Sequence, residues 1–252
     1  MIIKAIKTRK ITPPQDSIED ILTSVAKLIK KHSIFVITSK IVAIHEGRSI
    51  AKDKVPDKDS LVIAESDMYL PRSFTPGGWV MHTLKNNLLI PTSGIDESNA
   101  KDHYILWPTN PKRSAKYIWT FLNKISGVDD FGVIITDSHS IPLRRGIVGI
   151  SLAYFGFKPT YDYRGKTDIF GREMEVSQTN IVDSLASAAV LVMGEGNERT
   201  PISMIYDLPL IVKFEIKESK PSKPFSSFEV DIKEDLYSPF LTAVPWKKGG
   251  KK

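Results

Sequence analysis

Apolar residues recur along the chain in two rhythms, which predict a succession of strands and helices. Apolar residues three and four positions apart predict amphipathic helices over residues 17–31 and 112–125. A further helix over residues 180–193 is apolar or small nearly all round, so it must be buried. Short runs rich in Val and Ile indicate strands, which we place at residues 2–6, 33–37, 131–135, 147–155 and 202–206. The pattern predicts an α/β protein with mixed sheets flanked by helices.

The segments between these elements are predicted in less detail. Asp16 and Glu19 have the spacing of a capping box at the start of the helix over 17–31, and Ser177 or Thr179 is expected to cap the helix over 180–193. The remaining expected elements are a short helix or strand at 41–51, a helix at 61–69, a hairpin of 79–84 and 88–90 turning at Asn86–Asn87, a strand at 104–107 and a long loop at 160–173.

The pattern weakens towards the C-terminus. Beyond about residue 214, Lys, Ser and Pro interrupt it, and residues 228–246 regain only short structured pieces. We therefore predict one main domain over residues 1–213 and a C-terminal extension over residues 214–252.

One stretch, residues 131–146, combines structure with chemistry. Its apolar run gives way to polar residues from Thr136 and is closed by Pro142 and Gly146. A carboxylate, hydroxyls, a His and two Arg are therefore expected at the end of a rigid strand, where such sheets usually place chemistry. An ordinary strand end with a solvated polar turn is the alternative.

Composition excludes several classes of protein. The 252 residues are 41% hydrophobic and 25% charged, as in ordinary globular proteins. No run approaches the roughly 18 apolar residues of a membrane span, and the N-terminus lacks the layout of a signal peptide. Without cysteine, disulfides, thiolate nucleophiles and zinc–sulfur sites are excluded. These features fit a cytoplasmic protein with no membrane partner.

The net charge of +6 gives little support to nucleic-acid binding. Four of these charges come from the C-terminal Lys247, Lys248, Lys251 and Lys252, so the rest of the chain carries 6 − 4 = +2. Such a basic tail is more often a solvated end than a binding arm. We therefore expect no nucleic-acid partner.

Three carboxylates share a sequence context that suggests a metal site. Asp96, Asp137 and Glu195 are each expected in a Gly- or Ser-rich loop just after a buried element. Oxygen ligands without thiolates or paired His favour a hard cation such as Mg²⁺ or Mn²⁺, which in turn suggests phosphate chemistry. Glu195 also follows a helix C-terminus, where the helix dipole disfavours an anion unless a cation offsets it. Alternatively, Gly194 simply ends the helix and Glu195 is solvated.

The usual nucleotide-binding and hydrolytic motifs are absent from the sequence. Ser39–Lys40 at a strand end could hold a phosphate, but there is no Walker loop and no Gly-x-Gly-x-x-Gly after a strand. Arg144 and Arg145 offer fork-shaped donors for a carboxylate or phosphate. The five His lack zinc spacing, and no Gly-x-Ser-x-Gly elbow supports a serine hydrolase.

With these residues laid out, the sequence resembles the coenzyme F-420:γ-glutamyl ligases, and most closely a branch described as folate-metabolism γ-glutamate ligases. The matching segments are short, but they occur in the family's order and cover most of residues 1–210. They are 38–40, 46–48, 94–99, 136–138 through 144–146, 162–165, 170–173 and 191–195.

The resemblance implies an unusual α/β fold and a homodimer that uses GTP or ATP, two Mg²⁺ or Mn²⁺ ions and, as a further candidate ion, K⁺. Its partners would be L-glutamate and a small carboxylate-bearing coenzyme, joined by an amide bond. Carried over to this sequence, the metal ligands would be Asp96, Asp137, Ser138 and Glu195. The nucleotide would be held by Ser39, Lys40, Asn99, Met193, Gly194, Gly196, Asn197 and Thr200. The catalytic residues would be Asp137, Arg144 and Arg145. To the reacting acyl phosphate or the glutamate carboxylate we assign Arg144, Arg145 and Arg164.

Two departures from the family pattern affect the substrates. Where the deazaflavin enzymes typically have a Lys four positions after Lys40, this chain has Ile44, which removes a positive charge. Both GTP and ATP therefore stay open as the nucleotide, and both deazaflavin and pterin as the acceptor. The family's Asp-Thr pair is Asp137–Ser138, which keeps a hydroxyl. A non-catalytic nucleotide- or metabolite-binding protein of the same fold is the alternative from another class.

Overall fold

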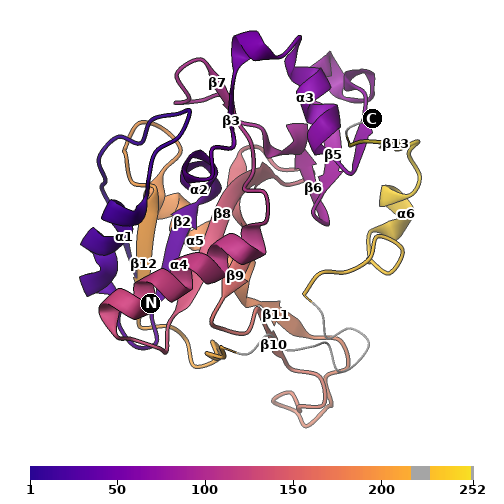
Figure 1. Ribbon diagram of the computed structural model, residues 1–252. Coiled ribbons are helices and arrows are strands. Elements are labelled where there is room, and N and C mark those ends of the chain that lie inside the picture. The colour runs from indigo at the N-terminus through magenta and orange to yellow at the C-terminus, as the bar shows by residue number, and fades with distance from the viewer. Residues whose placement is uncertain (217–227, 251–252) are drawn as a thin grey trace.

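The computed structural model describes residues 1–216 and 228–250. It is built around a five-stranded sheet in the order β1-β12-β2-β8-β9 (Figure 1). Only the central pair, β2 and β8, is parallel; the other neighbours are antiparallel. The strands are β1 (Ile2–Ile6), β2 (Ile34–Thr38), β8 (Gly132–Ser140), β9 (Ile147–Phe155) and β12 (Ile202–Tyr206).

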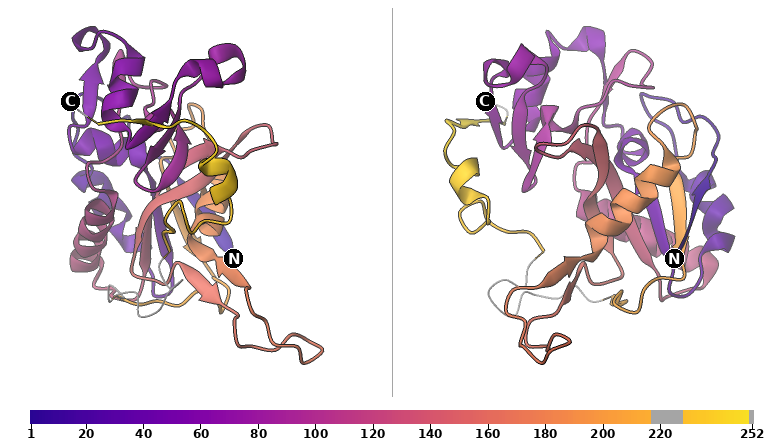
Figure 2. Two further views of the ribbon diagram at one scale, coloured as in Figure 1. Left: turned by 90° about the vertical axis from the view of Figure 1, so that its right-hand side faces the viewer. Right: turned by 180° about the vertical axis from the view of Figure 1, so that it is seen from behind.

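Helices cover both faces of this sheet, which is why β2 up to Ile37 and the first half of β8 are apolar. Phe35 and Ile37 of β2 pack on one side with α1 (Glu19–Val25) and α4 (Pro111–Ser126). Ile34 and Val36 face the other side, where α5 (Ile181–Met193) covers the sheet. The view from behind shows α5 crossing that face (Figure 2). The alternation of side chains along a strand thus supplies two cores from one run of residues.

A second sheet lies beside the first, in the order β13-β4-β5-β6. It consists of β4 (Met68–Leu70), β5 (His82–Lys85), β6 (Leu88–Pro91) and β13 (Lys247–Lys248). Helix α3 (Lys58–Glu65) packs next to it through a separate apolar cluster. That cluster contains Leu61, Val62, Met81, Ile95 and Leu106.

The remaining elements are short. They are α2 (Ser39–His45), β3 (Ser49–Ala51), β7 (His103–Ile105), β10 (Thr160–Asp162), β11 (Gln178–Asn180), α6 (Ser238–Leu241) and the 3₁₀ turns Ala26–Leu28, Lys52–Lys54, Arg72–Phe74, Pro76–Gly78 and Thr92–Gly94. Between β10 and β11 the chain forms an arm that projects from the body (Figures 1 and 2). No helix in residues 1–216 and 228–250 is long and apolar enough to cross a membrane.

The predicted α/β class is confirmed, and so are the five strands of the main sheet, the helices α4 and α5, and the hairpin of β5 and β6 that turns at Asn86–Asn87. The division into residues 1–213 and 214–252 stays a prediction. Within the extension, β13 pairs with β4 of the second sheet.

The most consequential error concerns residues 136–140, which we expected in a polar loop. They continue β8, and Asp137 pairs with Ile150 and Ser138 with Gly149 of β9. The register shifts between Ile135 and Thr136, because Leu152 of β9 has no partner on β8. This β-bulge lies where the residues of β8 become polar. Such bulges re-aim side chains. Because Asp137 pairs with Ile150, its carboxylate stands on a rigid strand rather than on a turn.

Several local predictions were also wrong. The capping box fails because Asp16 binds Arg9, with Nη1 of Arg9 2.8 Å from Oδ2, and α1 starts only at Glu19 and ends at Val25. Asn180, not Ser177 or Thr179, caps α5 through the backbone N–H of Asp183. The helix expected at 61–69 ends at Glu65, and residues 68–70 form β4.

Two predicted irregular segments contain strands. The loop expected over residues 160–173 begins with β10, which pairs with β11. Lys247 and Lys248 of the expected solvated tail form β13, while Lys251 and Lys252 lie outside the described residues.

Candidate functional site

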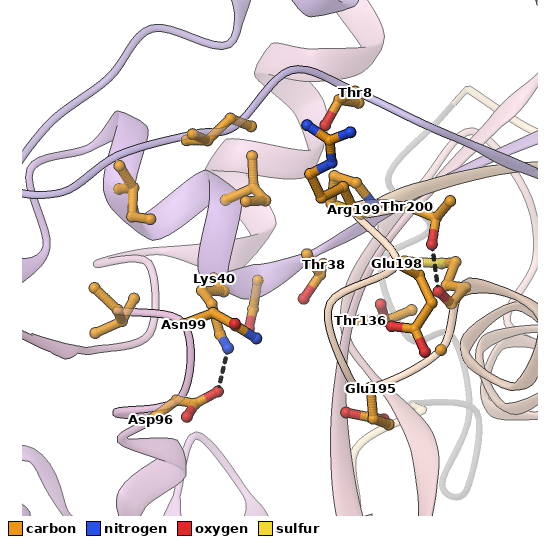
Figure 3. A pocket seen from close by; sticks show the side chains of 18 of the residues that line it. Thr8, Thr38, Lys40, Asp96, Asn99, Thr136, Glu195, Glu198, Arg199 and Thr200 are labelled. Carbon is orange, nitrogen blue, oxygen red and sulfur yellow. Dashed lines mark hydrogen bonds and ion pairs between the residues drawn. The ribbon is translucent and has the colours of Figure 1, made fainter. Parts of the chain in front are cut away.

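A cavity of about 590 Å³ opens at the edge of the main sheet where β2 and the apolar half of β8 end (Figure 3). Its size suits a nucleotide or coenzyme, since small-molecule sites commonly measure about 300–1,000 Å³. Four segments of the chain line it: 8–11, 38–44, 94–106 and 190–201, together with Thr136–Ser138 of β8. The predicted residues brought together here are Ser39, Lys40, Asp96, Asn99, Asp137, Ser138, Met193, Gly194, Glu195, Gly196, Asn197 and Thr200.

The parallel pairing of β2 and β8 explains why the first of these residues meet. Thr38 is the register partner of Thr136, so the residues that follow each of them emerge at the same edge of the sheet. Ser39 and Lys40 begin α2 there, and Asp137 and Ser138 lie beside them on β8. The backbone N–H of Thr38 donates to the carbonyl of Pro201 at 3.0 Å, which fixes the end of the 190–201 segment to this edge.

Asp96 lies opposite Lys40 and is held by it. Lys40 Nζ is 2.5 Å from Asp96 Oδ2 and also donates to the Ser98 hydroxyl at 3.0 Å. The backbone N–H of Ser98 donates to Asp96 Oδ1 at 2.6 Å. Burial raises the pKa of Asp96, but the charge and hydrogen bond of Lys40 and the donors of Ser98 outweigh it and hold the pKa below its usual value. Asp96 is therefore an anion in a partly buried setting.

Asp137 is the most perturbed carboxylate of the cavity. Burial raises its pKa to about 6, and neither the backbone N–H of Ser138, 2.8 Å from Oδ1, nor the indole N–H of Trp107 on Oδ2 reverses this. A buried carboxylate without a counter-cation is costly. A carboxyl group with a shifted pKa in a cavity is a common mark of a functional site.

Glu195 reaches the same region from the segment after α5. Its Oε2 accepts from the Ser138 hydroxyl at 3.5 Å, and burial raises its pKa. The same segment is joined to the loop of Asp96, because Asn99 Nδ2 donates to the Gly196 carbonyl at 3.1 Å. At Gly194, φ is +79° and ψ is 169°, a backbone conformation that in practice only glycine adopts. The predicted helix end at Gly194 and the cavity position of Glu195 are thus both found.

The donor set suits a hard divalent cation, although it is not a complete cage. Carboxylates and a hydroxyl from three segments line one cavity, which is the oxygen chemistry that Mg²⁺ and Mn²⁺ prefer. Among residues 1–216 and 228–250, no three His, Asp or Glu side chains form a ready-made metal cluster. Mg²⁺ is commonly bound by one or two carboxylates plus substrate phosphates rather than by protein alone. The residues therefore fit an ion that arrives with a nucleotide.

Three predicted Arg do not join the cavity. Arg144 and Arg145 are exposed in the turn between β8 and β9, outside the cavity lining. Arg164 lies in the arm, where its Nη2 is 2.7 Å from Asp162 Oδ2. The fork-shaped donors that sequence suggested for an anion are thus solvated or already paired within this chain.

The cavity also contains residues that the sequence interpretation missed. Arg9 and Lys10 line it from the segment after β1. Arg9 is bound to Asp16 and Asp20. Arg199 also lines the cavity, has no ion pair within the described chain, and lies with its guanidinium beside Thr8 (Figure 3). The nearby Trp107 donates to Asp137, and nothing in the sequence links these two residues.

The family comparison bears on the same residues. The model of the family described as F420-0:Gamma-glutamyl ligase matches residues 5–207, the range that contains every predicted site residue. The similar proteins include the "Coenzyme F420:L-glutamate ligase" of Methanopyrus kandleri, which is 31% identical over 84% of this chain and 90% of its own. The protein of that name from Methanocaldococcus jannaschii is 32% identical over 70% of this chain and 76% of its own. The one from Methanosarcina acetivorans is 31% identical over 78% and 82%. The chain belongs to the F420-0:gamma-glutamyl ligase family and is a ligase of the acid–amino-acid class.

Proposed function

We propose that this protein is a nucleotide-dependent γ-glutamyl ligase, which joins L-glutamate to a carboxylate of a small coenzyme such as F420-0. The observation that carries the proposal is the meeting of Asp96, Asp137 and Glu195 in one cavity with Lys40. Carboxylates suit divalent ions, and a Lys beside them suits the phosphates that such ions accompany. The names of the relatives support the choice of L-glutamate and a coenzyme F420 precursor.

A nucleotide is needed because forming an amide from a carboxylate and an amine in water is uphill. In the proposed reaction, an oxygen of the acceptor carboxylate attacks the γ-phosphorus of GTP or ATP, which forms an acyl phosphate and releases the nucleoside diphosphate. The amine of L-glutamate then attacks the acyl carbon, inorganic phosphate leaves, and the nitrogen loses a proton. A bound divalent ion would neutralise the charge that develops on the transferred phosphoryl group.

The residues of the chain take distinct parts in this scheme. Asp137, Asp96 and Glu195, with the Ser138 hydroxyl, would hold two Mg²⁺ or Mn²⁺ ions. Lys40 and Arg199 would contact the phosphates, since both cations line the cavity. The loop from Met193 to Thr200 is fixed at both ends, by the Thr200 hydroxyl on the Met193 carbonyl at 2.5 Å and by Thr38 on Pro201. Such a preformed loop would hold the nucleotide at little entropic cost.

The residue at position 44 bears on the choice of acceptor and nucleotide. Ile44 lines the cavity from α2 and is buried, so it offers an apolar contact where a Lys would offer a charge. A pterin of the folate type is therefore the alternative acceptor, and ATP the alternative nucleotide. A non-catalytic binding protein of the same fold is the second candidate, and the intact set of carboxylates argues against it.

Three further parts of the proposal come from the family resemblance. They are a homodimer, K⁺ as an additional ion and a cytoplasmic setting, where nucleotides and L-glutamate are available. Analytical ultracentrifugation tests the dimer, and the dependence of turnover on added K⁺ tests the ion.

Thermal unfolding with added ligands tests nucleotide binding. Ligands that bind only the folded state raise the melting temperature. We expect GTP or ATP with Mn²⁺ to raise it more than either component alone, and the larger rise to identify the nucleotide. No rise with any combination would contradict the proposal. Glutamate- and acceptor-dependent release of phosphate then separates the enzyme from the non-catalytic alternative.

A further inference from the structure

Trp107 lies beneath the cavity and touches its most perturbed carboxylate. The side chain is 1% exposed and does not line the cavity itself. Its indole N–H donates to Oδ2 of Asp137, thirty residues further along the chain. Trp107 is thus buried behind the cavity lining, which it meets at Asp137 and at Gly94.

The indole is fixed on several sides. Gly94 leaves room for the ring, since a Cβ at this position would lie 2.0 Å from Trp107 Nε1. Lys85 Nζ stands 5.2 Å from the ring centroid, and Arg48 Nε donates to the Trp107 carbonyl at 3.1 Å. Glu65 joins these two cations, with Oε2 2.6 Å from Arg48 Nη2 and 3.0 Å from Lys85 Nζ. The ring is therefore anchored to α3 and the second sheet.

This anchoring fixes the orientation of the Asp137 carboxylate. Oδ2 accepts from the indole and Oδ1 from the backbone N–H of Ser138. Because each carboxylate oxygen can accept two hydrogen bonds or ligands, both oxygens keep one free position while the group as a whole cannot rotate. A carboxylate held in this way is pre-organised for a cation, as metal ligands usually are by their hydrogen-bonding partners.

We propose that Trp107 is a positioning residue, whose indole N–H holds Asp137 in the orientation that binds a divalent ion together with the nucleotide phosphates. The inference rests on the proposed function, because it assigns Asp137 to that ion. It adds a link from the second sheet to the site: Glu65, through Lys85 and Arg48, secures the residue that orients Asp137.

Trp119 provides a matched contrast within the chain. It is also buried, 8% exposed, and its indole N–H donates to a main-chain carbonyl, that of Phe131, at 2.9 Å. Replacing either Trp by Phe removes one indole N–H and leaves one buried acceptor without a donor. Only at Trp107 is that acceptor a carboxylate of the cavity. A purely structural role would make the two substitutions equivalent in their effect on ligand binding.

The experiment measures the affinity for GTP by isothermal titration calorimetry, once with saturating Mg²⁺ and once with EDTA, in the wild type, Trp107→Phe and Trp119→Phe. The gain in affinity that Mg²⁺ gives should fall about 10–100-fold in Trp107→Phe, the range expected when the partner of a metal ligand is lost. The affinity in EDTA should stay unchanged in all three proteins, and Trp119→Phe should keep the full gain. ATP replaces GTP if ATP proves to be the nucleotide.

A spectroscopic measurement on the wild type covers the case in which Trp107→Phe does not fold. The four Trp give four indole N–H signals in a ¹H–¹⁵N spectrum, and variants at Trp79, Trp119 and Trp246 assign the fourth to Trp107. Adding Mg²⁺ and GTP should shift the Trp107 signal more than that of Trp119, and Asp137→Asn should abolish this difference.

The outcomes separate this inference from the proposed function. A wild type whose GTP affinity does not depend on Mg²⁺ would overturn the proposed metal role, and the inference with it. A wild type with the Mg²⁺ gain, and a Trp107→Phe variant that keeps the full gain, would overturn the inference alone. An indole signal of Trp107 that does not shift when Mg²⁺ and GTP are added would also overturn the inference alone.

Discussion

Lys40 Nζ lies 2.5 Å from Asp96 Oδ2, so two residues 56 positions apart form an ion pair at the mouth of the cavity (Figure 3). The ammonium group neutralises Asp96 and holds it through Ser98 as well. A divalent ion at Asp96 would take over this neutralisation and free Lys40 for the phosphates. In the proposed function, this pair would connect metal binding and nucleotide binding in a single contact.

Replacing Lys40 by Met is expected to weaken nucleotide binding. A hydrogen bond to a charged group contributes about 1.5–3 kcal/mol, which corresponds to roughly a 10–100-fold loss of affinity. Calorimetric titration with Mg²⁺ and GTP or ATP measures it. Lys124→Met, on the far end of α4, is the control and should bind as the wild type does. Equal affinity in Lys40→Met and the control would remove Lys40 from the phosphate site.

Gly94→Ala is expected to destabilise the fold through Trp107. Gly94 has φ +67°, and its Cβ would meet the indole, whereas Gly127 at the end of α4 has φ +70° and open space around it. Both substitutions carry the cost of a left-handed residue, about 1 kcal/mol. Gly94→Ala adds overpacking of about 1–3 kcal/mol. Urea denaturation compares the two free energies of unfolding, and equal losses would show that the indole is not wedged against Gly94.

Glu65→Gln should reveal a pH-dependent contribution to stability. Burial raises the pKa of Glu65, but Lys85 and Arg48 outweigh it and hold the pKa below its ordinary value of 4.5. Between the lowered pKa and pH 4.5, the unfolded chain binds more protons at Glu65 than the folded chain does. The stabilisation by ionised Glu65 is therefore complete above pH 4.5 and is lost as the pH falls through the lowered pKa. Burial also lowers the pKa of Lys85, which makes the counter-charge more important.

Glu65→Gln is expected to lower the free energy of unfolding by about 3 kcal/mol at neutral pH, since it leaves Lys85 and Arg48 without their partner. The difference between wild type and Glu65→Gln in urea denaturation should shrink below pH 4.5. Glu175→Gln, on the exposed arm, is the control. A difference that stays constant from neutral pH to well below 4.5 would rule out an ionised Glu65 as its source.

The exposed Arg residues of the sequence hypothesis receive a direct test. Arg144→Ala and Arg145→Ala should leave the affinity for the nucleotide within about twofold, because surface substitutions of this kind change free energies by only about 0.5 kcal/mol. Arg164→Ala should behave likewise, since its guanidinium is paired with Asp162. A large rise in the KM for L-glutamate in any of them would return that residue to the site.

Local pattern was sufficient for the parts of the fold where apolar residues decide the structure. Phe35 and Val36 in β2 and the small apolar residues of α5 could be placed from sequence because burial on all sides leaves a plain signature. The polar half of β8 could not, because Asp137 and Ser138 carry no strand pattern. Their conformation comes from pairing with β9, a partner that the local sequence does not specify.

The candidate site was predictable in part for a similar reason. Asp96, Asp137 and Glu195 each have a recognisable local context, and the family resemblance suggested that they bind metal together. The contacts that set their properties are long-range: Lys40 on Asp96 and Trp107 on Asp137. Spacing in the sequence contains no information about such pairs, and the Arg residues show the converse, since suitable chemistry alone does not bring a side chain to a cavity.

Asp137→Asn should abolish turnover and leave the fold intact. The substitution keeps the shape of the side chain and removes the charge that would hold the divalent ion. Circular dichroism and urea denaturation check the fold, and glutamate-dependent phosphate release checks turnover. Activity close to that of the wild type would reject the metal role of Asp137.

The most direct test of the proposed function is mass spectrometry of the product. The purified chain is incubated with F420-0, L-glutamate, Mn²⁺ and GTP or ATP, and a pterin carboxylate replaces F420-0 in a parallel reaction. We expect an acceptor that gains a glutamyl residue, with one nucleoside diphosphate and one phosphate released per bond, and no product with Asp137→Asn. Binding of the nucleotide and Mn²⁺ without any glutamylated product from either acceptor would contradict the proposed function.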